Sequence, residues 1–155
     1  MKSFCFLVNN EYFAVDVELV QKVMRKIIIT PVPSTPDDVA GIINLKGRVI
    51  TILNLGVLLG QMKKQNIKYG SNAFNAVIFK TFSGNEEQFG LIIDKPGNLA
   101  EIDDKTILPP SLPTGAEESF CISGIAEIDN RLLRIINIDS IINKYNGGNE
   151  DVEIF

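Results

Sequence analysis

The sequence contains no histidine, and this absence excludes more chemistry than any other feature of its composition. Without an imidazole there is no Ser–His or Cys–His nucleophile pair, and nearly all zinc and haem sites lose their usual ligand. Tryptophan is absent too, and none of the motifs GxxxxGK, GxGxxG and GxSxG occurs. The sequence therefore predicts a protein that is not an enzyme and holds neither a cofactor nor a metal.

Only two cysteines are present, Cys5 and Cys121, and each lies in an apolar run. Two cysteines so far apart do not make a disulfide framework, so we expect buried free thiols in a reducing compartment. No run of about 18 apolar residues could span a membrane, and the first apolar run is too short for a signal peptide. These features predict a cytoplasmic protein without direct membrane insertion.

Positive charge is scarce, since 15 Lys and Arg face 19 Asp and Glu and the net charge is −4. There is no basic tail, so we do not expect nucleic acid as a partner. The 155 residues, 45% of them hydrophobic, suit one domain that folds without a metal or a disulfide. Twelve glycines and seven prolines, scattered along the chain, predict many turns.

Short β-prone runs alternate with turn residues along the chain. Three hairpins are expected, over residues 4–17, 41–53 and 120–137, the second of them around a tight Lys46-Gly47 turn. Residues 95–98, Lys-Pro-Gly-Asn, predict a further turn. Residues 18–24 fit either one helical turn or a strand.

Three short helices are also expected, each starting after a polar residue that can cap it. The predicted caps and helices are Thr35 before 36–40, Asn54 before 55–59 and Asp139 before 140–145. The polar, lysine-rich residues 61–71 predict a solvated loop.

The sequence also contains an internal repeat. GIINLKGRVITILNLGVLLG, from Gly41, aligns with GIAEIDNRLLRIINIDSIIN, from Gly124, at an offset of 83 residues. Upstream, FAVDV from Phe13 aligns with FGLII from Phe89 at an offset of 76 residues. The repeat predicts two similar subdomains of about five strands, each followed by a short helix. Strands this short and numerous favour small closed barrels over a parallel sheet.

The segment from Thr30 to Leu55 resembles the CheW family. A proline-rich stretch precedes GIINLKGRVITILNL, and the family pattern is a proline-rich stretch followed by G-[IV]-[IV]-N-L-R-G-x-[IV]-[IV]-P-[IV]-[IV]-D-L. Further similar stretches lie at residues 4–23, 90–94 and 122–142, so the resemblance covers roughly residues 3–145.

The resemblance implies an all-β fold of two five-stranded SH3-like barrels packed on a shared hydrophobic core, with short helices. We expect one CheW-like domain over residues 1–148. Its two subdomains would be roughly 15–70, and 1–14 together with 71–145. A flexible tail would follow at 149–155.

The resemblance further implies a non-catalytic adaptor in bacterial chemotaxis, recruited to receptor arrays at the membrane. Its partners would be the cytoplasmic tip of chemoreceptors and the regulatory domain of the histidine kinase CheA; self-association in rings stays open. One alternative is a CheW-like adaptor of another pathway, such as surface motility or second-messenger output. A second alternative is a small-ligand-binding protein that uses the groove between the barrels.

Four residues match family positions implicated in receptor contact: Val20, Gln21, Thr30 and Lys46. The competing interpretations are a core valine, an ordinary strand residue and a solvated turn charge for Val20, Thr30 and Lys46 respectively. Asn44, Gly47 and Arg48 are expected to shape the hairpin beside them.

A kinase contact is expected near Leu91, Ile93, Asp94 and Lys95, although Leu91 and Ile93 also suit a plain barrel core. Arg48 and Arg131, equivalent in the repeat, would either join the two halves through carbonyl groups or lie solvated.

The chain departs from the family pattern at Lys46, Thr51 and Asn54, where the pattern has Arg, Pro and Asp. Lysine lacks the planar fork of arginine, so we expect a weaker receptor contact at this position. Arg48, two residues further on, is the candidate to compensate.

Overall fold

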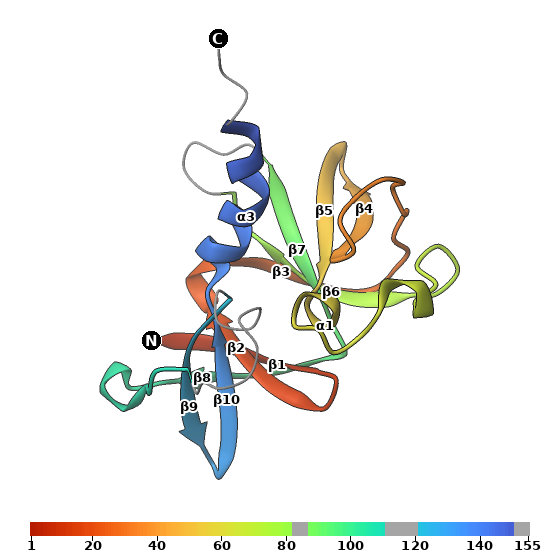
Figure 1. Cartoon of the computed structure of the whole chain (residues 1–155). Helices are drawn as coiled ribbons and strands as arrows, with labels where there is room; N and C mark the ends of the chain where they lie inside the picture. The colour runs from red at the N-terminus through yellow and green to blue at the C-terminus, as the bar shows by residue number, and fades with distance from the viewer. Residues whose placement is uncertain (82–86, 111–120, 151–155) are drawn as a thin grey trace.

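The computed structural model describes residues 1–81, 87–110 and 121–150, and within them ten strands dominate (Figure 1). The strands are β1 (Lys2–Val8), β2 (Glu11–Asp16), β3 (Val20–Ile27), β4 (Val39–Leu45), β5 (Arg48–Asn54), β6 (Phe74–Phe79), β7 (Gln88–Ile93), β8 (Lys95–Glu101), β9 (Ile122–Ile128) and β10 (Arg131–Ile136). The helices are the single turns η1 (Val17–Leu19), α1 (Leu55–Leu58), η2 (Lys64–Asn66) and η3 (Asp104–Thr106), and the longer α3 (Ile138–Glu150).

The strands form two five-stranded sheets, which confirms the predicted fold. We call β8-β1-β2-β10-β9 barrel I and β3-β6-β7-β5-β4 barrel II. Each sheet closes on itself through one isolated bridge to its last strand. Leu108 pairs with Ile125 of β9 in barrel I, and Thr30 pairs with Ile42 of β4 in barrel II. Closure removes the open edges that would otherwise be free to pair with another chain.

The two barrels exchange strands between the halves of the chain. Barrel I combines β1 and β2 with β8, β9 and β10, whereas barrel II combines β3, β4 and β5 with β6 and β7. The chain therefore crosses from one barrel to the other after β2, after α1 and after β7. This differs from the expected division, which grouped all of 71–145 with 1–14. Residues 74–93 lie in barrel II, because β7 pairs in parallel with β5 and β6 pairs with β3.

The pairing registers of the barrels match the offsets of the sequence repeat. In barrel I Phe13 pairs with Arg134, and in barrel II Phe89 pairs with Thr51. Phe13 to Phe89 is the 76-residue offset, and Thr51 to Arg134 is the 83-residue offset. The same correspondence extends to the barrel edges, where β8 and β3 both carry a bulge at the equivalent position. The repeat is therefore a repeat of structure, strand for strand.

Three apolar clusters fill the molecule. The largest lies between the barrels and includes Phe6, Phe13, Phe79 and Leu91, none of them more than 1% exposed. A smaller cluster fills each barrel, around Ile50 and Ile52 in barrel II and around Leu133 and Ile135 in barrel I. The shared cluster joins the two halves, because neither barrel could cover its inner-facing aromatic residues alone.

Three hairpins turn on two residues with positive φ, the conformation that a tight hairpin needs. These pairs are Asn9-Asn10, Lys46-Gly47 and Asp129-Asn130, with φ between 52° and 84°. The three predicted hairpins are confirmed by the pairings β1–β2, β4–β5 and β9–β10.

Helix starts follow the repeat as well. Asn54 caps α1, because its Oδ1 accepts a hydrogen bond of 3.0 Å from the Val57 amide. Asn137, its repeat partner, caps α3 through a 3.1 Å bond from the Ser140 amide. The predicted cap Asp139 is wrong by two residues, since it lies inside α3, and the helix runs on to Glu150 rather than ending near 145.

Two other local predictions are wrong. No helix forms over 36–40, because the Thr35 hydroxyl donates to the Val32 carbonyl (2.9 Å) instead of capping it. The expected turn at 95–98 belongs to strand β8, because Lys95 and Pro96 pair with β1. Pro96 is accommodated there because β8 lies at the end of the sheet order. The ambiguous residues 18–24 divide between η1 and β3.

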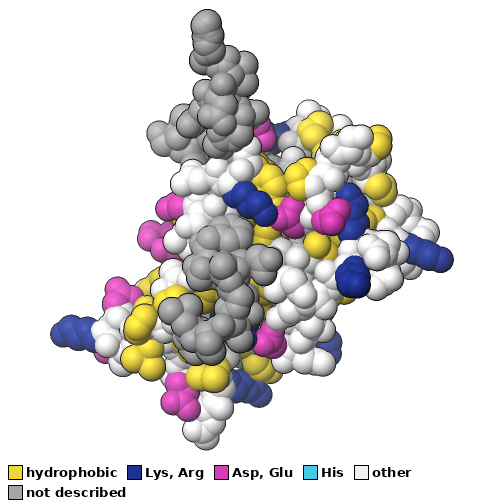
Figure 2. All heavy atoms as spheres, in the orientation of Figure 1, with side chains coloured by type: hydrophobic (Ala, Val, Ile, Leu, Met, Phe, Trp, Pro, Cys, Tyr) yellow, Lys and Arg dark blue, Asp and Glu magenta, His cyan; other side chains and the backbone are white. Residues whose placement is uncertain are grey.

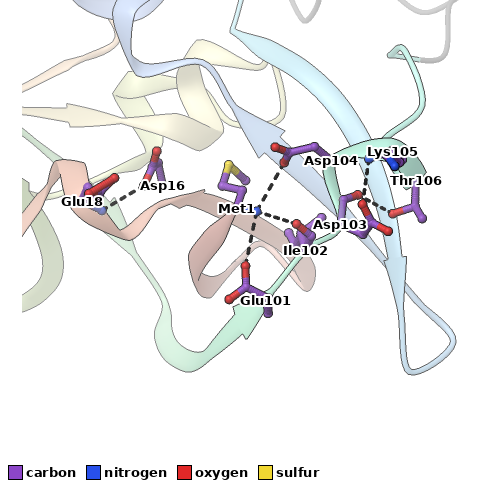
Figure 3. A network of polar contacts seen from close by, with 9 residues as sticks. All are labelled: Met1, Asp16, Glu18, Glu101, Ile102, Asp103, Asp104, Lys105 and Thr106. Carbon is purple, nitrogen blue, oxygen red and sulfur yellow. Dashed lines mark hydrogen bonds and ion pairs between the residues drawn. The ribbon is translucent and has the colours of Figure 1, made fainter.

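The acidic residues near barrel I have structural roles (Figure 3). The Asp103 carboxylate accepts from the Lys105 amide (3.0 Å) at the start of η3. The Met1 ammonium donates to the Ile102 carbonyl (2.6 Å) and lies 3.3 Å from Asp104 and 3.4 Å from Glu101. Asp103 and Asp104 are thus engaged in turn and ion-pair contacts.

Candidate functional site

The β4–β5 hairpin presents its charges from a closely held turn. The Asn44 side chain accepts a 3.0 Å hydrogen bond from the Gly47 amide. Lys46 and Gly47 both have positive φ, which glycine adopts at no steric cost. Lys46 and Arg48 are exposed on either side of Gly47. Asn44 and Gly47 therefore set the backbone, and the two cations face outward from it.

Both cations line a polar pocket at one end of barrel II, with a volume of about 440 Å³. Its lining residues come from β3, β4, β5, β6 and β7 and the segment after β6: Gln21, Lys22, Leu45, Lys46, Arg48, Lys80, Thr81 and Gln88. We call it the basic pocket, because four of these residues are Lys or Arg. On the face shown in Figure 2, by contrast, Lys and Arg are interspersed with Asp and Glu.

Gln88 organises the floor of the basic pocket. This side chain is 5% exposed, and its amide donates to the Phe79 carbonyl (2.8 Å) and to the Gln21 side-chain oxygen. Gln21 is exposed but is held in place by that contact. A buried amide with its bonds made keeps its orientation, so the pocket is shaped before any partner arrives.

The pocket contains two of the four predicted receptor residues, Gln21 and Lys46. Val20 is half-buried beside it and packs against the shared core, opposite Phe79. Thr30 is exposed and closes barrel II, exchanging two 2.9 Å backbone hydrogen bonds with Ile42. Neither Val20 nor Thr30 lines the pocket.

The four predicted kinase residues do not share a surface. Leu91 and Ile93 are 1% and 2% exposed in the shared core, so their side chains cannot reach a partner in this fold. Asp94 is exposed, and its carboxylate accepts from the Asn9 amide (2.7 Å), which ties the β1–β2 turn to the end of β7. Lys95 is exposed and lines the mouth of barrel I.

Two departures from the family pattern have a local explanation. The Asn54 amide donates to the buried Tyr69 hydroxyl (2.8 Å), a bond that a carboxylate could make only by accepting the hydroxyl proton instead. Burial raises the pKa of Tyr69, and the Asn54 bond partly opposes that rise. Thr51 lies in β5, between β4 and β7, where proline would remove a donor from the ladder.

An ion pair connects α3 to the loop before β4. The Lys144 ammonium lies 2.8 Å from the Asp38 carboxylate, which is 8% exposed. Burial raises the pKa of the nearby Tyr145 hydroxyl above its ordinary range, and the Asp38 carboxylate raises it further. Tyr145 also packs against Phe89 of β7, with ring centroids 6.1 Å apart. The last helix of the second half is thereby held against barrel II (Figure 1).

Among the residues that the structure describes, no group of three His, Cys, Asp or Glu side chains could hold a metal ion. In the same part of the chain, no helix combines the length and apolar character needed to cross a membrane.

Sequence reasoning did not identify Lys22, Lys80 and Gln88 as parts of the pocket. They lie on β3, after β6 and on β7, and only the order of strands in barrel II brings them beside the β4–β5 hairpin. The 76-residue offset offered one signal for Gln88, because it aligns this residue with Tyr12 at the same place in barrel I.

Comparison with known proteins places this architecture. The sequence model of the CheW-like domain family matches residues 2–146. The chain belongs to the CheW-like domain family. It is 29% identical over 140 residues to a chemotaxis protein CheW of Thermotoga maritima, covering 88% of this chain and 84% of that protein. It is 27% identical over 137 residues to a chemotaxis protein CheW of Rhizobium meliloti, covering 88% and 83%.

A solved structure agrees with the family assignment. The scaffolding protein TtCheW from Thermoanaerobacter tengcongensis superimposes with a TM-score of 0.73 at 28% sequence identity, covering 88% of this chain and 84% of that one. The predicted family and the two-barrel fold are confirmed.

Proposed function

We propose that this chain is a non-catalytic chemotaxis scaffold that couples chemoreceptors to the histidine kinase CheA. The observation that carries the proposal is the family match over residues 2–146, together with relatives that are named as chemotaxis proteins and a structural neighbour titled a scaffolding protein. A scaffold of this kind acts from the cytoplasm, where receptor tips and kinase meet.

The receptor contact is proposed at the basic pocket. Four cations gather there on a chain whose net charge is −4, so an acidic helix of a receptor tip would meet a local field of opposite sign. Lys46 and Gln21, the predicted residues in the pocket, would touch the partner. Lys22, Arg48 and Lys80 extend the same surface.

The kinase contact is proposed at Asp94 and Lys95, the exposed pair at the β7–β8 junction. Leu91 and Ile93 would support it from the core without touching the partner. Because this junction and the basic pocket are separate surfaces, one chain could hold both partners at once.

Titration calorimetry against an isolated CheA regulatory domain, at moderate salt, tests the adaptor role. We expect saturable binding with a Kd in the micromolar range or tighter, weakened about tenfold by Lys95→Glu. A folded chain that does not bind would contradict the coupling to CheA and favour an adaptor of another kinase.

Receptor binding is tested with Lys46→Glu. We expect at least a tenfold loss of affinity for a receptor signalling-tip fragment, and an unchanged free energy of unfolding, because an exposed turn charge contributes little to stability. The matched control is Lys105→Glu, the same charge reversal on exposed η3. Equal losses in both variants would show a general charge effect and contradict the pocket as the receptor site.

A further inference from the structure

The mouth of barrel I contains a hollow that barrel II lacks. It has a volume of about 310 Å³, at the lower end of the range for ligand pockets. Cys5, Leu7, Tyr12, Ala100 and Leu133 line it. Four of them lie on neighbouring strands of one sheet, and Leu7, Tyr12 and Leu133 pair in a single row across β1, β2 and β10. The hollow is therefore built from regular strands.

The strand-for-strand repeat explains why barrel I is hollow. Cys5 corresponds to Ile78 of barrel II, because the pairs Cys5–Ala14 and Ile78–Gly90 are equivalent. Ala100 corresponds to Met24, because each pairs with the equivalent residue of β1 or β6. Smaller side chains thus stand at two lining positions where barrel II has larger ones. Space that barrel II fills from within stays open to solvent in barrel I.

The rim of the hollow carries two cations. The Arg131 guanidinium lies over the Tyr12 ring, 4.7 Å from its centroid, which leaves the edge donors of the fork free. Lys95 lies on the same rim. Neither cation has a carboxylate partner within residues 1–81, 87–110 and 121–150, and Asp129 is the one acidic residue that lines the hollow. The rim therefore has an excess of one positive charge.

We propose that the mouth of barrel I binds a small apolar carboxylate, with its hydrocarbon part in the hollow and its carboxylate between Arg131 and Lys95. An apolar wall with a few polar groups at one end suits a ligand of this class. Arginine bonds a carboxylate through two parallel N–H donors, which fixes the orientation of the ligand. Burial raises the pKa of the Cys5 thiol, so this residue stays neutral and forms part of the apolar wall. The site is separate from the basic pocket of barrel II and independent of the proposed adaptor role.

Octanoate is the probe, titrated into the ¹⁵N-labelled full chain and followed by amide chemical shifts. We expect saturable shifts confined to β1, β2, β8 and β10, and at least tenfold weaker binding of octanol, which lacks the charge. Arg131→Gln should weaken octanoate about tenfold, whereas Arg48→Gln, at the equivalent position of barrel II, should leave its affinity unchanged.

Two filling variants test the hollow itself. Cys5→Ile and Ala100→Met install the types of side chain that barrel II carries, and each should abolish octanoate binding while leaving the midpoint of thermal unfolding equal or higher. Absence of saturable shifts in the native chain would overturn the proposal, as expected if the hollow receives a side chain of a partner protein instead. Undiminished binding to Ala100→Met in a folded chain would also overturn it, and equal binding of octanol would overturn the carboxylate assignment.

Discussion

The mouths of the two barrels occupy equivalent places in the fold and carry different chemistry. In barrel II the mouth is polar and basic, and in barrel I it is apolar and hollow. The equivalent pairs, barrel II first, are Lys80 and Leu7, Lys22 and Asn98, Lys46 and Asp129, Gln88 and Tyr12, and Arg48 and Arg131. Arginine alone is retained in both. The repeat therefore preserves the strand register, whereas the side chains at the mouths differ freely.

The comparison extends to the positions that hold each barrel closed, where equivalent residues do not contribute equally to stability. Three predictions test how far the equivalence goes, starting with the pair for which we expect the largest difference.

Gly41 and Gly124 are equivalent residues at the closing bridges. A Cβ on Gly41 would lie 2.2 Å from the Thr30 carbonyl oxygen, and its φ of +153° disfavours any other residue. We expect Gly41→Ala to lower the free energy of unfolding by about 3–4 kcal/mol, measured by urea denaturation. Gly124→Ala, which meets the Ile107 methyl group at 2.5 Å without an unfavourable φ, should cost about 1–2 kcal/mol. Equal losses would contradict the strain at Gly41.

Asn54 and Asn137 both cap a helix, but Asn54 also donates to buried Tyr69. Asn137→Ala should cost about 1 kcal/mol through the lost cap. Asn54→Ala should cost about 2–3 kcal/mol, because it also leaves the Tyr69 hydroxyl unpaired. Denaturant unfolding compares them, and Tyr69→Phe in the Asn54→Ala background should recover part of the loss. No recovery would mean that the hydroxyl is not the cause.

The smallest difference is expected at the hairpin turns. Asn44→Ala should cost about 0.5–1 kcal/mol, because the Gly47 amide loses its side-chain acceptor. Glu127, the equivalent residue in barrel I, makes no such bond among the described residues, so Glu127→Ala should change stability by less than about 0.5 kcal/mol. A comparable loss for Glu127→Ala, in the same denaturation series, would contradict the assigned role of Asn44.

Much of the fold follows from local sequence. The hairpin at Lys46-Gly47, the cap at Asn54 and the correspondence of Gly41 with Gly124 depend on neighbouring residues, whose turn chemistry can be recognised directly. Local signals also misled. Lys95-Pro96-Gly97-Asn98 has the composition of a turn, yet it pairs as an edge strand because β1 lies beside it and supplies its partners.

The site was less accessible to sequence reasoning. Lys46 and Gln21 were identified by their resemblance to family positions, and the structure brings them into one pocket. Leu91 and Ile93 were equally consistent with a contact or a core, and only the packing of β7 between β5 and β6 buries them. An alternating or continuous apolar run predicts burial but does not say which neighbours cause it.

By itself, the sequence determined the all-β class, the repeat, the hairpins and the absence of histidine chemistry, because each depends on residue type and short spacing. Only the tertiary structure decided the exchange of strands between barrels, the basic pocket of barrel II and the hollow of barrel I. These depend on pairing between segments far apart in the chain. Such pairing is selected by the burial of the whole shared core, in which β1, β2 and β7 contribute aromatic and aliphatic side chains from both halves at once.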